Sequence, residues 1–282
     1  MTIAVAIVSV SPCSAAEQQP ATTSDAARQD ALRSISLRRI DPAYREAIKQ
    51  VLADTTLYRR LPTTVVDCRP AMFTFLTQNP EVLVEVWRVL GLSNAELVRT
   101  EQRKFRFSDG GGTTGDLVIV EEKCDAAAQN RIVMYARGQY EGKPFSRPLS
   151  AECVLLLRSG SMKERSGRPF VAARLDSFVR FDRRSLELIA KAVHPWVGRT
   201  ADRNFTDTLT FVSNFSFTAE RRPEAIDRLA GELRRVDAQR RSGLSTVALE
   251  CSQLMDSTAI DGIPVAIAVD QPQGVRPASL AR

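Results

Sequence analysis

Hydrophobic and polar positions alternate with a period of two through the middle third of this chain. Residues 96–107 end in a Lys-Phe-Arg-Phe alternation, and apolar or β-branched residues fill further stretches at 116–124, 131–140, 151–158 and 170–181. A period of two places successive side chains on opposite faces of a strand. Because short turn-forming segments separate these stretches, the pattern predicts five consecutive strands in an antiparallel meander.

One of the predicted turns contains the glycine-rich run GGGTTG at 110–115. In composition it resembles a phosphate-binding loop. Such a loop needs a strand before it and a helix after it, whose N-terminal amides face the anion, and often a lysine. Here a strand follows and no lysine comes next, so the run is interpreted as a hairpin turn.

Apolar residues at helical spacing precede the predicted strands. Asp41 followed by Pro42 is typical of a helix start, and the same signal recurs at Asn79 and Pro80. The elements expected in this part of the chain are a helix near 41–54, a strand at 62–68, a buried helix at 69–78 and a helix from 80 to the stop at Gly91.

Helical patterns also follow the strands. Asp182 is expected to cap a helix that ends or kinks at His194 and Pro195. Residues 199–218 fit either a helix or a strand, and a helix is favoured. A further helix is expected at 223–236, with a proline at its first position.

The pattern divides the chain into four parts. Residues 1–16 read as a leader, 17–40 as a flexible lead-in, 41–236 as a single α+β domain and 237–282 as a mostly disordered tail with a short helix near 247–254. The expected fold class is α+β, with an antiparallel sheet of about five to six strands covered by helices.

The leader assignment rests on an apolar stretch from Ile3 to Val10, followed by small residues through Ala16. This is the pattern of a secretory signal peptide, and it predicts an extracytoplasmic protein, periplasmic or secreted. No Lys or Arg precedes Arg28, so the usual basic start of a signal peptide is missing. A lipoprotein site at Cys13 and an ordinary apolar N-terminus are the alternatives.

Loss of the leader would remove Cys13 and leave Cys68, Cys124, Cys153 and Cys251. An even number of cysteines in an exported protein permits two disulfide bonds, in three possible pairings. Four buried free thiols are the alternative. No pair has CxxC spacing, which argues against a zinc knuckle or a thioredoxin-type site.

Composition narrows the class of protein. The chain is 44% hydrophobic and 26% charged, as in an ordinary soluble domain, and carries a formal net charge of +6. The basic excess suits an anionic lipid or a cell-wall polymer as partner, or is simply a solvated surface. Its arginine pairs are scattered without interleaved aromatic residues, so no nucleic-acid partner is expected. No segment is long and apolar enough to predict a membrane span.

The order of the predicted elements resembles the helix-grip fold of the START and polyketide-cyclase-like superfamily. The resemblance covers about residues 60–220: a strand, two helices, five antiparallel strands and a long helical segment at 182–218. It implies an apolar cavity between sheet and helix that holds a lipid, sterol, polyketide or similar molecule. The segment Trp196–Phe205 and the GGGTTG run also resemble uncharacterised bacterial proteins with predicted secretion signals, from which no activity follows.

Five residues are candidates for ligand binding. Three of them, Trp87, Met134 and Tyr140, could line an apolar cavity or simply fill the core, and the same holds for Phe73 and Phe75. Arg199 and Arg203 lie at helical spacing with Asp202. They would either recognise an anionic head group or form a structural ion-pair network.

Catalytic chemistry finds little support. His194 is the only histidine, which excludes a multi-histidine metal site, and its place at a predicted helix end suits a capping role. Glycoside hydrolysis needs two carboxylates that face one cleft. Glu121 and Glu122 are adjacent in a strand and point to opposite faces, so they do not form such a pair. The sequence therefore predicts no catalytic residue, metal or cofactor. It favours a secreted binding module for a hydrophobic or amphipathic ligand, with an extracytoplasmic structural or interaction protein as the alternative.

Overall fold

The computed structural model describes residues 19–124, 129–143, 145, 147–164, 167–182 and 196–256, without the side chains of 196–199, 255 and 256. The leader, the helix expected after Asp182, His194 and the last part of the predicted tail lie outside the described residues.

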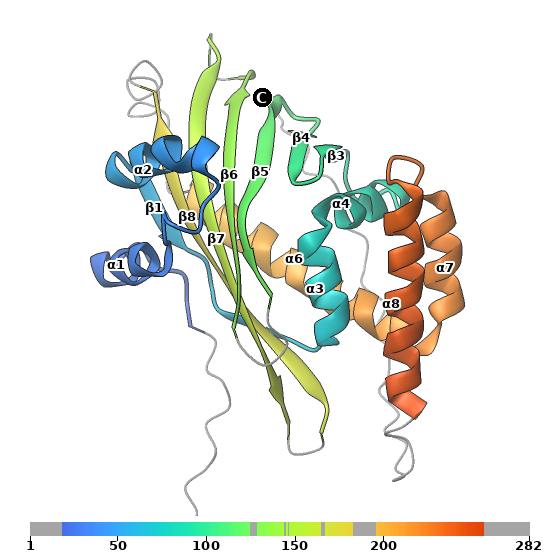
Figure 1. The fold of residues 1–282 in the computed structure, drawn as a ribbon. Coiled ribbons are helices and arrows are strands. Elements are labelled where there is room, and N and C mark those ends of the chain that lie inside the picture. Colours follow the sequence, from blue (N-terminus) through green and yellow to red (C-terminus); the bar gives the residue numbers. More distant parts are fainter. Residues whose placement is uncertain are drawn as a thin grey trace, which may run out of the picture.

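Eight antiparallel strands form one sheet, in the order β1-β8-β7-β6-β5-β4-β3, with β2 also paired to β8 (Figure 1). The strands are β1 Leu57–Arg60, β2 Thr64–Val66, β3 Glu96–Glu101, β4 Lys104–Ser108, β5 Thr113–Lys123, β6 Asn130–Tyr140, β7 Leu149–Lys163 and β8 Pro169–Phe181. The predicted α+β class and antiparallel pairing are confirmed. The predicted number of five to six strands is wrong.

Two features account for the additional strands. Residues 96–107, expected as one strand, contain parts of both β3 and β4, which form a tight hairpin with Lys104 opposite Glu101. No Gly, Pro or Asn marks this turn. The other addition is β1, whose sequence Leu-Tyr-Arg-Arg does not suggest a partly buried strand. Arg60 is tolerated there because it pairs with the buried carboxylate of Asp176 and with the partly exposed carboxylate of Asp30.

The two edges of the sheet are short or irregular. β1 pairs with residues 176–179 of β8 and β2 with residues 171–173, so both lie along the same edge, with Pro62 between them. At the opposite edge, the register of β3 shifts between Arg99 and Glu101.

The three glycines of the GGGTTG run lie in the hairpin turn between β4 and β5, as predicted, and the following residues 113–115 begin β5. Gly110 and Gly112 have φ values of 70° and 113°, which side chains other than glycine rarely adopt. The Asp109 carboxylate accepts hydrogen bonds from the amides of Gly111 at 2.7 Å and Thr113 at 2.8 Å. These contacts close the turn on itself.

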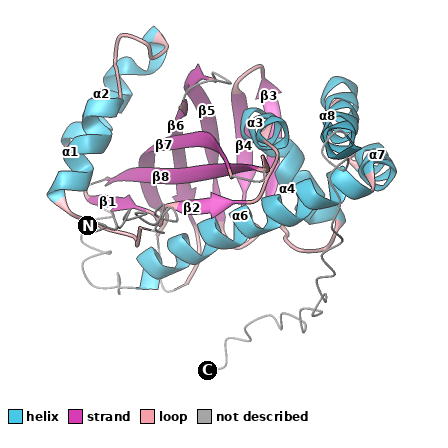
Figure 2. Ribbon diagram, turned by 90° about the horizontal axis from the view of Figure 1, so that it is seen from below, coloured by secondary structure: helices cyan, strands magenta, loops and turns pink. Residues whose placement is uncertain are grey.

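Helices near the N-terminus cover one face of the sheet, which we call the α2 face (Figure 2). They are α1 Asp25–Ser34, a single 3-10 turn Pro42–Tyr44 and α2 Arg45–Ala53. Ile48 and Val51 of α2 pack with sheet residues that include Val133, Val154 and Phe178. The helix expected near 41–54 is therefore confirmed.

Helix α1 corrects the prediction of a flexible lead-in at 17–40. Ser24 caps the helix by accepting a hydrogen bond from the amide of Ala27, and Ala27 and Ala31 are buried against the rest of this layer. The polar composition of this segment suggested a flexible chain, because the side chains that α1 buries are small alanines. Asp30, on the same helix, accepts hydrogen bonds from two arginines of the sheet.

The remaining helices form the layer against the opposite, α3 face of the sheet. They are α3 Pro70–Gln78, α4 Pro80–Val89, α6 Trp196–Arg221, α7 Pro223–Glu232 and α8 Ala238–Asp256. Their shared core includes Met72, Val86, Phe215 and Leu244, with Val171 from the sheet. The helix favoured at 199–218 is confirmed. It runs along the β2 edge toward α7 and α8 (Figure 2).

Helix α8 corrects the prediction of a mostly disordered tail over residues 238–256, the part of that tail that the structure describes. The expected short helix near 247–254 is part of a 19-residue helix. Its buried side chains are Leu244, Ala248 and Cys251, which join the core beneath α3 and α6. The helix was not predicted over its full length because its sequence alternates only weakly between apolar and polar positions and contains several serines and Gly243.

Candidate functional site

A pocket of about 610 Å³ lies between α3, α8 and the lower end of the sheet, and we call it the α3 pocket. Its walls come from α3, the ends of β5 and β6, the far part of β7, one residue of β8 and one of α8. The lining residues are Pro70, Ala71, Phe73, Thr74, Phe75, Gln78, Cys124, Asn130, Ser159, Gly160, Ser161, Lys163, Val171 and Val247.

The lining separates into an apolar wall and a polar wall. Phe73 and Phe75 of α3, Val171 of β8 and Val247 of α8 supply the apolar wall. Serine hydroxyls and the exposed ammonium group of Lys163, from β7, supply most of the polar wall. Thr74 and Gln78 of α3 and Asn130 of β6 add further polar groups to the lining. Within the part of the chain that the structure describes, Lys163 makes no hydrogen bond or ion pair through its side chain. The pocket therefore suits a molecule with an apolar body and a polar or anionic end.

The length of β7 creates the polar wall. The strand was expected at 151–158 but extends through Lys163 and pairs there with Pro169. The alternation of the strand places Ser159, Ser161 and Lys163 on the α3 face. The Ser-Gly-Ser run reads as a turn in sequence, yet its backbone stays in the sheet.

Above the α3 pocket, the same face of the sheet presents half-buried apolar side chains. Met134 and Leu155 are opposite each other in register, as are Ile132 and Leu157. Met134 and Leu157 pack against the small buried cluster of Phe105, Ile119 and Ile132. An apolar surface thus continues from the pocket along the middle of the sheet.

Four of the five predicted ligand-binding residues have described side chains; they are not brought together, and none of the four lines the α3 pocket. Phe73 and Phe75, also expected as possible cavity-lining residues, do line it. Met134 lies on the α3 face of β6. Trp87, on α4, packs the edge of its ring against Phe211 of α6. Tyr140, at the end of β6, donates a hydrogen bond to the carbonyl of Lys143 at 2.9 Å.

The two predicted arginines have different surroundings. Arg203 is 81% exposed on α6 and lies 3.6 Å from Asp207, one turn along the helix. Asp202 points instead to the sheet, where it accepts a bidentate hydrogen bond from Arg59. The side chain of Arg199 lies outside the described residues. The Arg59–Asp202 pair connects α6 to β1, as expected for the alternative in which this segment forms structural ion pairs.

A buried cluster of charges on the α2 face is the densest polar site that sequence analysis missed. The Asp176 carboxylate is fully buried and accepts hydrogen bonds from Tyr58 at 2.7 Å, Arg60 at 2.6 Å and Arg158 at 2.9 Å. Asp30 of α1 also accepts from both arginines, at 2.6 and 2.8 Å.

The pKa shifts of Asp30 and Tyr58 indicate that this cluster has a structural role. Hydrogen bonds from Arg158 and Arg60 lower the pKa of Asp30 to about 2. Burial and the hydrogen bond to Asp176 raise the pKa of Tyr58. Asp30 thus stays charged and the Tyr58 phenol stays protonated near neutral pH, so neither group is poised to exchange a proton. The network anchors α1 to β1, β7 and β8.

The four cysteines of the described chain are free thiols, so neither of the two expected disulfide bonds is present among them. Cys68 and Cys251 are fully buried, and burial raises the pKa of both to about 12. Burial also raises the pKa of Cys153, to about 11. Only Cys124, at the rim of the α3 pocket, is exposed.

Thiol labelling tests this arrangement. In a Cys13→Ser variant at neutral pH, we expect a maleimide to modify Cys124 first, because the buried thiols are neither accessible nor ionised. Cys68 and Cys251 should become modified only when the protein unfolds. Peptide mass spectrometry after timed quenching measures the order. Modification of Cys68 or Cys251 in the native protein as fast as Cys124 would contradict the packing described above.

The described residues contain no group of three or more His, Cys, Asp or Glu side chains that could hold a metal ion. Over the same residues, no helix combines the length and apolar character needed to cross a membrane. Comparison of the chain with known protein families finds no matching family, and comparison with curated proteins finds no match.

Proposed function

We propose that this protein is an extracytoplasmic binding module for an amphipathic molecule, and that the α3 pocket holds the apolar part of that ligand. The observation that carries the proposal is the division of the pocket into an apolar wall and a polar wall that includes Lys163. Its volume of about 610 Å³ falls within the range of small-molecule sites. The apolar leader at 1–16 supports the extracytoplasmic location.

The arrangement of the layers is the second support. We infer a helix-grip-like fold, because a long helix, α6, lies against the same side of the antiparallel sheet as α3. The half-buried Met134, Leu155 and Leu157 would extend the apolar surface available to a long ligand. One difference from a simple grip is that α6 contacts the sheet mainly through β2 and packs also on α7 and α8.

A series of fatty acids provides the direct test. Each methylene buried in an apolar site contributes about 0.8 kcal/mol, so two methylenes raise affinity by about 15-fold when both become buried. We expect affinity to rise from octanoate to decanoate to dodecanoate in calorimetric titrations, until the pocket is filled. Octanol, decanol and dodecanol should follow the same trend with lower affinity, because the Lys163 ammonium group favours a carboxylate.

Two tryptophan substitutions on α8 locate the site. Val247 lines the pocket, whereas Leu249, two residues further on the same helix, is 53% exposed. Val247→Trp should fill part of the pocket and weaken dodecanoate binding at least tenfold, and Leu249→Trp should leave it unchanged. Lys163→Gln should weaken dodecanoate more than dodecanol. Equal binding by both tryptophan variants, or no binding of any chain by the native protein, would overturn the proposal and favour an interaction protein without a small-molecule site.

A further inference from the structure

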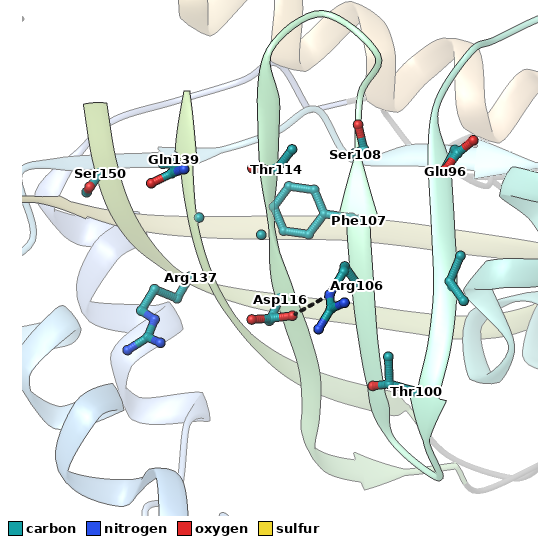
Figure 3. A pocket seen from close by; sticks show the side chains of 13 residues that line it. Glu96, Thr100, Arg106, Phe107, Ser108, Thr114, Asp116, Arg137, Gln139 and Ser150 are labelled. Atoms are coloured by element: carbon teal, nitrogen blue, oxygen red, sulfur yellow. Dashed lines mark ion pairs between the residues drawn. The ribbon is translucent and has the colours of Figure 1, made fainter. Parts of the chain in front are cut away.

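A second opening lies on the α2 face of the sheet, beyond the part that α1 and α2 cover (Figure 3). It has a volume of about 730 Å³ and is formed by β3 to β7. A smaller opening of about 210 Å³ continues from it toward β8 and shares Arg137 and Ser150. We call the two together the outer groove. It is on the opposite side of the sheet from the α3 pocket.

A row of five charged residues of alternating sign crosses the floor of the outer groove. Each member is paired in register with the next on the neighbouring strand. The order across β4 to β8 is Arg106, Asp116, Arg137, Glu152 and Arg180. Neighbouring strands are about 4.8 Å apart, so the three arginines are spaced by about 10 Å.

The two carboxylates of this row are each paired with an outer arginine. Asp116 lies 3.7 Å from Arg106, as the dashed line in Figure 3 marks. Glu152 accepts hydrogen bonds from Arg180 and from the Tyr135 hydroxyl. Arg137, the central arginine, stands apart from the Arg106–Asp116 pair in Figure 3, and its side chain makes no hydrogen bond or ion pair within the described chain. The row therefore presents one positive charge beyond those that its carboxylates neutralise.

A second row of uncharged polar groups runs beside the charged one. Ser108, Thr114, Gln139 and Ser150 are in register across β4 to β7. Phe107 is on the opposite face of β4, because strand residues alternate. Its ring covers Gly115 and Gly138, where an added Cβ would lie 2.8 and 3.1 Å from ring atoms. The lining of the groove thus offers hydroxyls and one side-chain amide in the row beside Arg137, and it also includes the carboxylates of Glu96 and Asp182.

We propose that the outer groove binds an anionic sugar, meaning a polyhydroxylated molecule that carries one carboxylate or phosphate. The planar guanidinium of Arg137 matches either anion with two parallel hydrogen bonds. The neighbouring serine, threonine and glutamine side chains suit the hydroxyls of a sugar. The groove is also larger than a simple inorganic anion requires. Phe107 is the one aromatic residue of the described lining, and the packing of its ring over Gly115 and Gly138 disfavours stacking on a nucleobase.

Titration with four probes separates the parts of this proposal. Galacturonate and glucose 6-phosphate represent the two sources of negative charge, galactose lacks the charge and inorganic phosphate lacks the sugar. We expect at least one of the two anionic sugars to bind at least tenfold more tightly than both galactose and inorganic phosphate, measured by chemical-shift titration. Whichever anionic sugar binds identifies the preferred anion. Galactose or inorganic phosphate binding as tightly as the anionic sugars would overturn the proposal.

Substitutions then assign the site to Arg137. Arg137→Gln should weaken the binding of the preferred anionic sugar about tenfold or more. Arg137→Lys should weaken it less, because lysine keeps the positive charge and loses only the two parallel hydrogen bonds of the guanidinium group. Arg203→Gln makes the same charge change on α6, outside the groove, and should bind like the native protein. Val247→Trp, in the α3 pocket, should also leave this binding unchanged. Unaltered binding by Arg137→Gln would overturn the assignment.

Discussion

Replacing Asp176 with asparagine is expected to lower the free energy of unfolding by about 3–5 kcal/mol. The substitution keeps the size of the side chain but removes its charge from a fully buried site. Arg60 and Arg158 would then share Asp30 as their remaining carboxylate partner in this cluster. Breaking a buried ion pair from one side is costly because the arginines stay buried without full compensation.

Asp116→Asn provides the matched control for this measurement. Asp116 lies on the same face of the sheet and also pairs with an arginine, but its side chain is 69% exposed. Exposed pairs contribute about 0–1 kcal/mol, so the control should unfold near the native midpoint. Urea unfolding followed by circular dichroism compares the two variants. A loss of less than about 1 kcal/mol for Asp176→Asn would show that the cluster does not anchor α1 as described.

Replacing Leu244 with alanine is expected to cost about 2–5 kcal/mol. Leu244 is fully buried on α8 and belongs to the core that α3, α6 and α7 share. Its removal leaves a cavity where the helix docks, and the surrounding side chains relax only in part. A loss of this size is a large fraction of the stability of an ordinary domain.

Leu249→Ala on the same helix is the control, because Leu249 is 53% exposed. Surface substitutions of this kind change stability by about 0.5 kcal/mol or less. Thermal or urea unfolding of both variants tests whether α8 is part of the domain. Equal stability of the two would mean that α8 contributes no buried contacts and that the predicted disordered tail was the better description.

Elements that carry their own local signals could be predicted from the sequence. Asn79 and Pro80 predicted the start of α4, and Pro70 is the first residue of α3 within one residue of the expected boundary. Gly91, with φ 67°, follows the end of α4 as expected. These signals depend on the backbone geometry and hydrogen-bonding capacity of a few adjacent residues, and both follow from the residue types themselves.

The elements that were missed depend on distant parts of the chain. Helix α1 is held by Asp30, whose partners Arg60 and Arg158 are 30 and 128 residues away. Strand β1 contains Arg60, which is stable in the sheet only because Asp176 is its neighbour. A local pattern of polarity cannot show that two charges in different segments neutralise each other.

The candidate sites were missed for a related reason. The α3 pocket depends on Lys163 and Ser161 continuing a strand that seemed to end earlier. The charged row of the outer groove depends on the register of five strands, which brings residues from Arg106 to Arg180 onto one line. Register follows from the turns and from packing on both faces, and it is not visible in any one segment.

The short edges of the sheet bear on how this protein behaves at high concentration. An exposed edge strand with free backbone groups is a template for pairing with another chain. Here one edge is divided into strands of four and three residues with Pro62 between them, and the other has a bulge and the charges of Glu96, Arg99 and Glu101. Neither described edge offers a long regular run to a second molecule. The folded protein should therefore resist intermolecular strand addition and the fibrous aggregates that grow from it.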